Sequence, residues 1–125
     1  MSGFNKRKRE AEDRYKHDQD LEFKASARRN KLLGLWAAEQ MGISGADADA
    51  YAKEVVISDF DRPGDEDVRE KVEADFTAKG LDISGHRIRK EMDRLMEEAR
   101  AQVRRRHNII QERKRAVIQL HAHTL

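Results

Sequence analysis

The spacing of the hydrophobic residues, interrupted at glycine and proline, is the feature that most limits how this chain can fold. Hydrophobic side chains recur every three or four residues from Leu21 to Met41, and Gly42 then ends the pattern. The same spacing returns in three further segments, which are separated by the turn at Pro63, the only proline, and by Gly80. No segment alternates hydrophobic and polar residues for long enough to indicate a sheet. The sequence therefore predicts an all-α chain.

Candidate helix caps and short turns indicate how the four segments connect. Asp65 stands at an expected N-cap position after the proline turn, and Ser84 is a second N-cap candidate. Short connections favour antiparallel neighbours, so residues 21–103 are predicted to form a four-helix bundle. Hydrophobic residues at helical spacing usually pack inside such a bundle. The residues expected in its core are Leu32, Trp36, Tyr51, Val55, Phe60, Val72, Phe76, Ile88, Met92 and Leu95.

Gly34 lies inside the first predicted helix, although glycine is a poor helix former. A glycine in a helix interior costs about 1 kcal/mol relative to alanine. A close approach of a neighbouring helix would account for a glycine at this position. We therefore expect the first helix to touch a second helix at Gly34.

Charge divides the chain into three segments. Residues 1–20 carry a net charge of +1, residues 21–100 carry −4, and residues 101–125 carry +5. The first segment has good helix propensity but too little hydrophobic surface to fold alone. We expect an N-terminal arm (residues 1–20) that is helical or partly disordered, the bundle over residues 21–103, and a basic helical tail (residues 104–125). Whether the tail extends the fourth helix, forms its own helix or frays stays open.

The composition excludes several classes of protein. The chain has no cysteine, so it has no disulfides, thiolate metal sites or cysteine nucleophiles. No apolar run approaches the roughly 20 residues needed to span a bilayer. The cationic run from Lys6 to Arg9 is not followed by the apolar segment of a secretory signal. We expect a cytoplasmic protein with no membrane insertion.

An acidic loop is the strongest candidate for a metal site. Pro63 stands at the fifth position of a calcium-binding loop pattern, where an oxygen ligand is needed. The alternative is a helix-capping turn with a solvated acidic face, and this alternative is favoured. The residues at matching positions of the calcium loop are Asp59, Asp61, Gly64, Asp65, Asp67 and Glu70.

No set of residues indicates an enzyme. The chain has five histidines, of which His121 and His123 could hold a metal only weakly, because two ligands make a weak site. The glycines are spaced as turn residues and form no phosphate-binding loop. We therefore expect no catalytic residue, no metal site and no cofactor, while weak binding of a nucleotide or a divalent cation stays an open alternative.

Two basic runs raise the alternative of a helical nucleic-acid-binding module. Lys6 to Arg9 and Arg104 to Arg106 could contact phosphates. Acidic residues follow the first run at once, and no aromatic residues are interleaved with the arginines for base stacking. Nucleic acid is therefore a disfavoured partner.

A third basic run, residues 28–31, has a structural interpretation. It reads RRNK and precedes the glycine-containing part of the first predicted helix. These side chains could pair with the acidic loop at residues 59–67 and hold the second and third helices in place. We favour this structural role over a freely solvated cationic face, although exposed pairs of this type contribute only about 0–1 kcal/mol each.

The order of motifs along the chain resembles a known family. Residues 15–18 read YKHD, residues 27–38 read ARRNKLLGLWAA, and residues 64–68 read GDEDV, with Tyr51, Val55 and Asp59 between the last two. Over roughly residues 4–100, the sequence resembles the zeta subunit of the alphaproteobacterial F-type ATP synthase. This ATPase-inhibitor family was once described only as a domain of unknown function. The basic tail after about Arg100 has no recognised counterpart in the family pattern.

The resemblance implies a fold and a function. The family is a four-helix bundle with an N-terminal inhibitory segment, which enters a catalytic interface between the α and β subunits of the soluble sector and reaches toward the rotor. The implied function is an inhibitory regulatory subunit that blocks ATP hydrolysis. The implied partners are the α, β and γ subunits. The implied location is the cytoplasmic face of the inner membrane, where the chain would be held peripherally through the ATP synthase.

The resemblance also assigns the inhibitory role to the arm. Independently, Phe4 and Tyr15 would supply aromatic anchors of the kind that dominate binding energy. Arg7, Arg9 and Arg14 would orient the arm against an acidic partner surface. The predicted partner-binding residues are Phe4, Arg7, Arg9, Glu12, Arg14, Tyr15, His17 and Asp18.

Overall fold

A computed structural model describes residues 2–61 and 64–124 of the chain. These residues contain four helices and no strand, so the all-α prediction is confirmed. The helices are α1 (Ser2–Gln40), α2 (Gly45–Asp61), α3 (Asp65–Ala78) and α4 (Gly85–Thr124).

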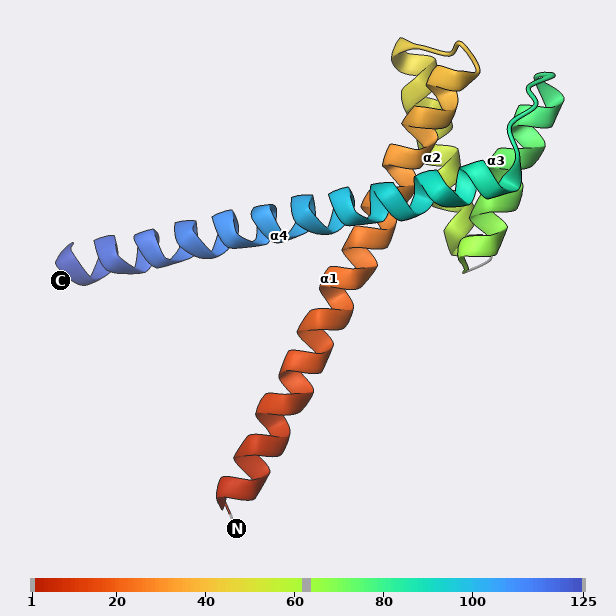
Figure 1. Ribbon diagram of the computed structural model, residues 1–125. Coiled ribbons are helices and arrows are strands. Elements are labelled where there is room, and N and C mark those ends of the chain that lie inside the picture. The colour runs from red at the N-terminus through yellow and green to blue at the C-terminus, as the bar shows by residue number, and fades with distance from the viewer. Residues whose placement is uncertain (1, 62–63, 125) are drawn as a thin grey trace.

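The second half of α1 and the first half of α4 form a body with the two short helices (Figure 1). α1 packs against α2 and α4, while α3 fills the space beside α2 and α4. Figure 1 shows α4 crossing α1 near the middle of both helices, so that the two outer halves project in different directions. The tail therefore continues α4 without a break, which answers the question that the sequence leaves open.

The predicted helix ends follow from local backbone chemistry. Gly42 and Gly80 adopt φ angles of 73° and 74°, which glycine tolerates at no steric cost. The amide of Ile43 donates to the carbonyl of Ala38 at 2.8 Å, and the amide of Leu81 closes the equivalent bond at the end of α3. Both ends are therefore Schellman motifs.

The two predicted N-caps have different outcomes. The amide of Arg87 donates to Ser84 Oγ at 3.2 Å, so Ser84 caps α4 as predicted. The predicted cap at Asp65 is wrong, because Gly64 occupies the N-cap position of α3 without a side-chain cap bond. Asp65 is the first helical residue, and its carboxylate binds Arg29 instead.

The hydrophobic core lies where the four helices meet. Phe76 is fully buried and meets the half-buried Trp36 edge to face, with ring centroids 5.7 Å apart. Tyr51 is buried and donates its hydroxyl hydrogen bond to Asp75 at 2.7 Å. The other buried residues of this core are Leu33, Ala37, Ala38, Val55, Val68, Val72, Ile88, Met92 and Leu95.

Three predicted core residues lie elsewhere than expected. Phe60 is 61% exposed, so its assignment to the core is wrong. At 100° per residue it lies about 140° around α2 from the buried Val55, which turns it away from the core. Leu32 and Trp36 are only partly buried against the edge of the core, because α1 turns Leu33, Ala37 and Ala38 into the core instead.

The expected close approach at Gly34 is confirmed. A Cβ atom built at Gly34 would lie 2.6 Å from the Cα of Ala52 in α2. Real Cβ atoms essentially never come so close to another backbone atom, so only glycine fits between these helices without a shift. This contact fixes the distance between α1 and α2.

Candidate functional site

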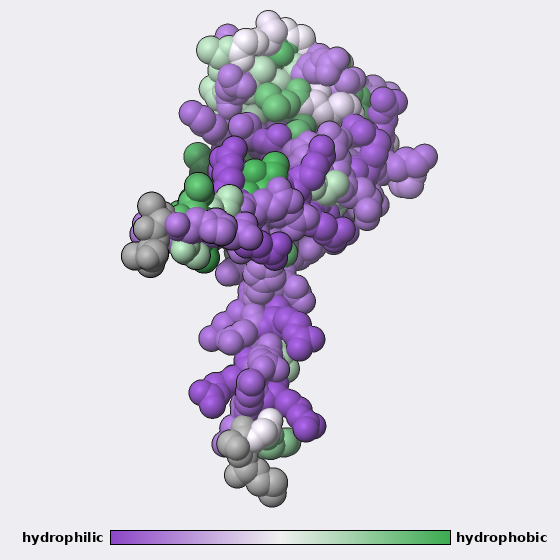
Figure 2. Space-filling model, turned by 90° about the vertical axis from the view of Figure 1, so that its left-hand side faces the viewer, coloured by the Kyte–Doolittle hydropathy of each residue, from purple (hydrophilic) through white to green (hydrophobic). Residues whose placement is uncertain are grey.

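The arm is an exposed continuation of a helix that is anchored in the body. Every side chain from residue 3 to residue 20 is exposed, Leu21 is the first that is partly buried, and Ala25 is the first that is fully buried. Figure 1 shows this half of α1 standing away from the other helices, and Figure 2 shows that the face of the arm in view is almost entirely hydrophilic. Since α1 has no break at residue 20, the body fixes the direction of the arm.

Two aromatic rings share one face of the arm. Phe4 is 69% exposed and Tyr15 is 66% exposed. Their separation of eleven residues is close to three helical turns, and Ala11 lies between them on the same side. Asp18 follows about one turn after Tyr15. The structure therefore places a sparse apolar face on an otherwise charged helix.

The remaining predicted arm residues are distributed around this face. Arg7 and Arg14 lie along one edge of the aromatic face, and Glu12 lies along the other edge. Arg9 and His17 lie on the opposite side of α1. Most of the predicted partner-binding residues therefore lie on or beside one face of the arm, while Arg9 and His17 lie on the other side.

His17 has a contact that the sequence does not indicate. Its ring lies against that of His107 in α4, with centroids 4.7 Å apart. The two residues are 90 positions apart, so no local pattern could have paired them. His17 therefore marks the point where α1 separates from α4.

Polar bonds hold the base of the arm against α4. Arg100 donates to both carboxylate oxygens of Glu22, from Nη2 to Oε1 at 2.7 Å and from Nε to Oε2 at 3.3 Å. Six residues further along α1, Arg28 Nε donates to Gln102 Oε1 at 2.5 Å. The hydrogen bond from Arg100 lowers the pKa of Glu22, and this effect outweighs the opposing effect of partial burial. Both bonds join residues that no sequence pattern connects.

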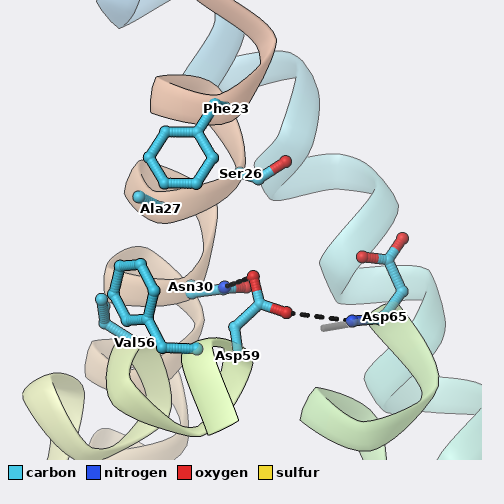
Figure 3. Close-up of a pocket in the computed structure, with 9 residues that line it drawn as sticks. Phe23, Ser26, Ala27, Asn30, Val56, Asp59 and Asp65 are labelled. Carbon is cyan, nitrogen blue, oxygen red and sulfur yellow. Dashed lines mark hydrogen bonds between the residues drawn. The ribbon is translucent and has the colours of Figure 1, made fainter. Parts of the chain in front are cut away.

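A buried polar pair anchors the helices below the arm. Arg29 is 3% exposed and Asn30 is fully buried. Arg29 Nη2 donates to Asn30 Oδ1 at 2.9 Å and to Asp65 Oδ1 at 2.8 Å. Asn30 Nδ2 donates to Asp59 Oδ2 at 3.1 Å, and the other oxygen of Asp59 accepts from the Gly64 amide at 3.2 Å (Figure 3). The predicted pairing of the basic run with the acidic loop is confirmed for Arg29 and Asn30.

The electrostatics of this anchor follow from its geometry. The hydrogen bond from Arg29 lowers the pKa of Asp65, and the positive charges of Arg29 and Arg89 add to the effect. Arg28 and Lys31, the other cationic residues of the predicted run, do not join the anchor: Arg28 bonds to Gln102, and Lys31 is exposed.

Two of the carboxylates at calcium-loop positions have protein partners. Asp59 and Asp65 accept the hydrogen bonds of the anchor. Among residues 2–61 and 64–124, no three histidine, aspartate or glutamate side chains are arranged to hold a metal ion. Pro63 and the side chain of Asp61 lie outside the described part of the chain.

An apolar groove of about 320 Å³ lies between α1 and α2 next to the anchor. The exposed rings of Phe23 and Phe60 meet across it, with centroids 6.3 Å apart. Figure 3 shows Phe23, Ala27 and Val56 along the apolar side and Asn30 at the polar end. The periodicity of α2 could have shown that Phe60 lies away from the core, but not that its ring meets Phe23 of α1.

Comparisons with known proteins agree with this architecture. A solution NMR structure with 46% sequence identity matches with a TM-score of 0.61, and the match covers 69% of this chain and 98% of the other. No curated protein matched the sequence. No helix in the described residues is long and apolar enough to cross a membrane. The sequence profile of the family named ATPase inhibitor subunit zeta matches residues 1–102, so the chain belongs to this family.

Proposed function

We propose that this chain inhibits ATP hydrolysis by the F-type ATP synthase by inserting its arm at a catalytic interface between an α and a β subunit. The main observation in support of the proposal is that the arm is exposed, while the rest of the same helix, α1, is packed in the body. Its described side chains from residue 3 onward are exposed until Leu21. The family match covers the arm and the body together.

The chemistry of the arm suits a groove between two protein subunits. Burying the exposed rings of Phe4 and Tyr15 supplies hydrophobic free energy, and arginines at the edge of the aromatic face supply orientation. An α-helix that places apolar residues about every third or fourth position in a hydrophobic groove is a common form of peptide recognition.

The body serves as the stop in this mechanism. It is held by the core, by the Arg29–Asp65 anchor and by the Arg100–Glu22 pair at the base of the arm. Because α1 is continuous from arm to body, force on the body is transmitted along the helix to the inserted segment. A body wider than the groove would keep the arm from passing through, so that rotation past the γ subunit is blocked in the hydrolysis direction.

The proposed partners are therefore the α, β and γ subunits of the soluble catalytic sector. Through them, the protein would be held at the cytoplasmic face of the membrane. The arm would contribute the specific contacts and the body the mechanical resistance. No residue of this chain takes part in the chemistry of hydrolysis under the proposal.

The test is ATP hydrolysis by the isolated soluble sector with added protein. Full-length protein is expected to lower hydrolysis, and a variant lacking residues 1–18 is expected to lose the effect. A variant lacking residues 108–125 is the matched control, because it removes the other projecting helix and keeps the arm. Circular dichroism of each variant verifies that the body is folded. Equal inhibition by the arm-deleted protein would contradict the mechanism.

A further inference from the structure

The tail is the second exposed helix of the molecule. α4 continues through Thr124, and no side chain beyond Gln111 is buried or half-buried in its described part. At 1.5 Å per residue, the tail extends roughly 30 Å from the body. The family match ends at residue 102, so the tail lies outside the segment to which the inhibitory role is assigned.

The tail combines strong positive charge with exposed aliphatic side chains. Residues 104–124 contain six lysines and arginines and a single acid, Glu112, which makes a formal net charge of +5. Ile109, Ile110, Val117 and Ile118 are 46%, 41%, 61% and 69% exposed. Exposing aliphatic side chains to water costs free energy through the hydrophobic effect, so a surface that covers them would be favoured.

The helix confines the aliphatic residues to one side, while the cations lie all around it. At 100° per residue, the four aliphatic residues span about half of the circumference of α4. Arg106, Arg113 and Lys114 lie within this half, and their long aliphatic stems can lie along an apolar surface while the charges reach water. The other half carries Arg104, Arg105 and Arg115 among neutral polar residues and Glu112. The tail is thus a basic amphipathic helix.

We propose that the tail binds the surface of an anionic lipid bilayer, lying parallel to it with its aliphatic side at the boundary between headgroups and acyl chains. Basic amphipathic helices bind such surfaces through buried apolar area and attraction to anionic headgroups. A bilayer surface offers anionic headgroups along the whole length of the helix to the cations within and beside the aliphatic half, whereas a protein groove would need a separate partner for each one.

Charge disfavours the other occupants of this face. A second copy of the tail also carries a charge of +5, so two tails would repel each other. A nucleic acid would neutralise the cations but leave the aliphatic side in water, and residues 101–125 contain no phenylalanine, tyrosine or tryptophan for base stacking. Residues 21–100 carry −4, so an anionic surface repels the body and attracts the tail.

The test is cosedimentation of the full-length protein with lipid vesicles. Vesicles of phosphatidylglycerol and phosphatidylcholine in equal amounts are compared with pure phosphatidylcholine at roughly 0.1 M salt, where the Debye length is about 10 Å. We expect binding to the anionic vesicles only, decreasing as salt rises. Absence of binding to the anionic vesicles overturns the proposal.

Three sets of glutamine substitutions separate the contributions, since glutamine is a good helix former. Arg105→Gln with Arg113→Gln and Lys114→Gln is expected to lower the partition coefficient about 100-fold, because each cation near the surface contributes about 1 kcal/mol. Ile110→Gln with Val117→Gln and Ile118→Gln is expected to lower it at least about 10-fold at unchanged charge. The third set is the control: Lys6→Gln, Arg7→Gln and Lys8→Gln remove the same charge from the arm and should leave binding unchanged.

The results of these experiments distinguish an inserted helix from nonspecific attraction and from other partners. An equal loss of binding in the arm control would show nonspecific attraction of cations and would overturn the proposal. Full retention of binding by the aliphatic variant would exclude an inserted helix. Binding to a short DNA duplex that exceeds vesicle binding, or tail-dependent dimers in sedimentation equilibrium, would assign the tail to another partner. The inhibition assay on the soluble sector contains no lipid, so its result is separate from this one.

Discussion

Single residues decide how closely the helices of the body approach. Gly34 allows α1 and α2 to touch, Arg29 links α1 to the start of α3, and Asn30 links α1 to the end of α2. Buried polar groups of this kind are costly unless each donor and acceptor is paired. In the described residues, no buried side-chain nitrogen or oxygen lacks a hydrogen-bond partner. The anchor therefore fixes the orientation of α3 without an unpaired charge in the interior.

Gly34→Ala should destabilise the body, although alanine favours helix. The new Cβ would lie 2.6 Å from Ala52 Cα, and overpacking of this kind costs about 1–3 kcal/mol, which offsets or exceeds the gain in helix propensity of about 1 kcal/mol. Gly3→Ala in the same helix is the control, since a Cβ atom added there would have no neighbouring atom within 4 Å. Urea unfolding should show a lower midpoint for Gly34→Ala only. A raised midpoint would refute the close contact.

The Arg29–Asp65 pair should contribute stability that depends on pH. The pKa of Asp65 is lower in the folded protein than its ordinary value of 3.8, so the folded state binds the proton less readily than the unfolded state. The contribution is therefore complete above that ordinary value and is lost as the pH falls through the folded-state pKa. The difference in stability between wild type and Asp65→Asn should shrink on acidification below about pH 4.

Thermal unfolding from pH 7 to pH 2 measures this difference. Glu70→Gln, a substitution at an exposed position of the same helix, controls for the loss of one negative charge. Because the Asp65 carboxylate is itself more than half exposed, the effect should be modest. A difference between wild type and Asp65→Asn that stays constant over this range would show that the pair does not stabilise the fold through its charge.

At the scale of the elements, α1 and α4 each serve two purposes. Their inner halves supply the core, where Ala25 and Ala99 are 1% and 0% exposed, and their outer halves project into water. Small buried side chains allow close helix packing where the helices cross. The outer halves differ in chemistry: the arm has mixed charges and two aromatic rings, and the tail is basic and aliphatic.

One face of the arm should carry the inhibitory contacts. Phe4→Ala with Tyr15→Ala removes both exposed rings from this face, and each interface residue of hot-spot strength is worth about 2 kcal/mol or more. The concentration needed for half inhibition of the soluble ATPase should rise at least about 30-fold, which corresponds to the loss of one such residue. The control, Asp13→Ala with Lys16→Ala, alters the opposite side at unchanged net charge and should leave inhibition within a few-fold of wild type. Reversed results would place the contact face on the other side of the arm.

At the scale of the whole molecule, stability is concentrated in the body. The buried residues lie between Ala25 and Ala99, while the described ends of both long helices are exposed. A helix without tertiary contacts is only marginally stable in water, so its hydrogen bonds open at little cost in free energy.

Amide hydrogen exchange should reveal this difference. In both outer halves, over residues 5–18 and 112–122, backbone amides should exchange about as fast as those of a fraying helix. In the core, exchange at Val72, Phe76 and Ile88 should require global unfolding. Binding of the soluble ATPase should protect the arm, and binding of anionic vesicles should protect the tail. Protection of the free arm equal to that of the core would contradict an arm available for insertion.

The sequence by itself determines the helical class, the ends at Gly42, Gly80 and Ser84, and most of the core, because these depend on local backbone chemistry and on helical spacing. It also indicates the family through motifs in residues 4–100. Only the tertiary structure decided that Phe60 meets Phe23 across a groove, that Leu33 is buried in preference to Leu32, and that His17 meets His107. These outcomes depend on how α1 packs against α2 and α4, a relation between residues far apart in the chain that no local pattern encodes.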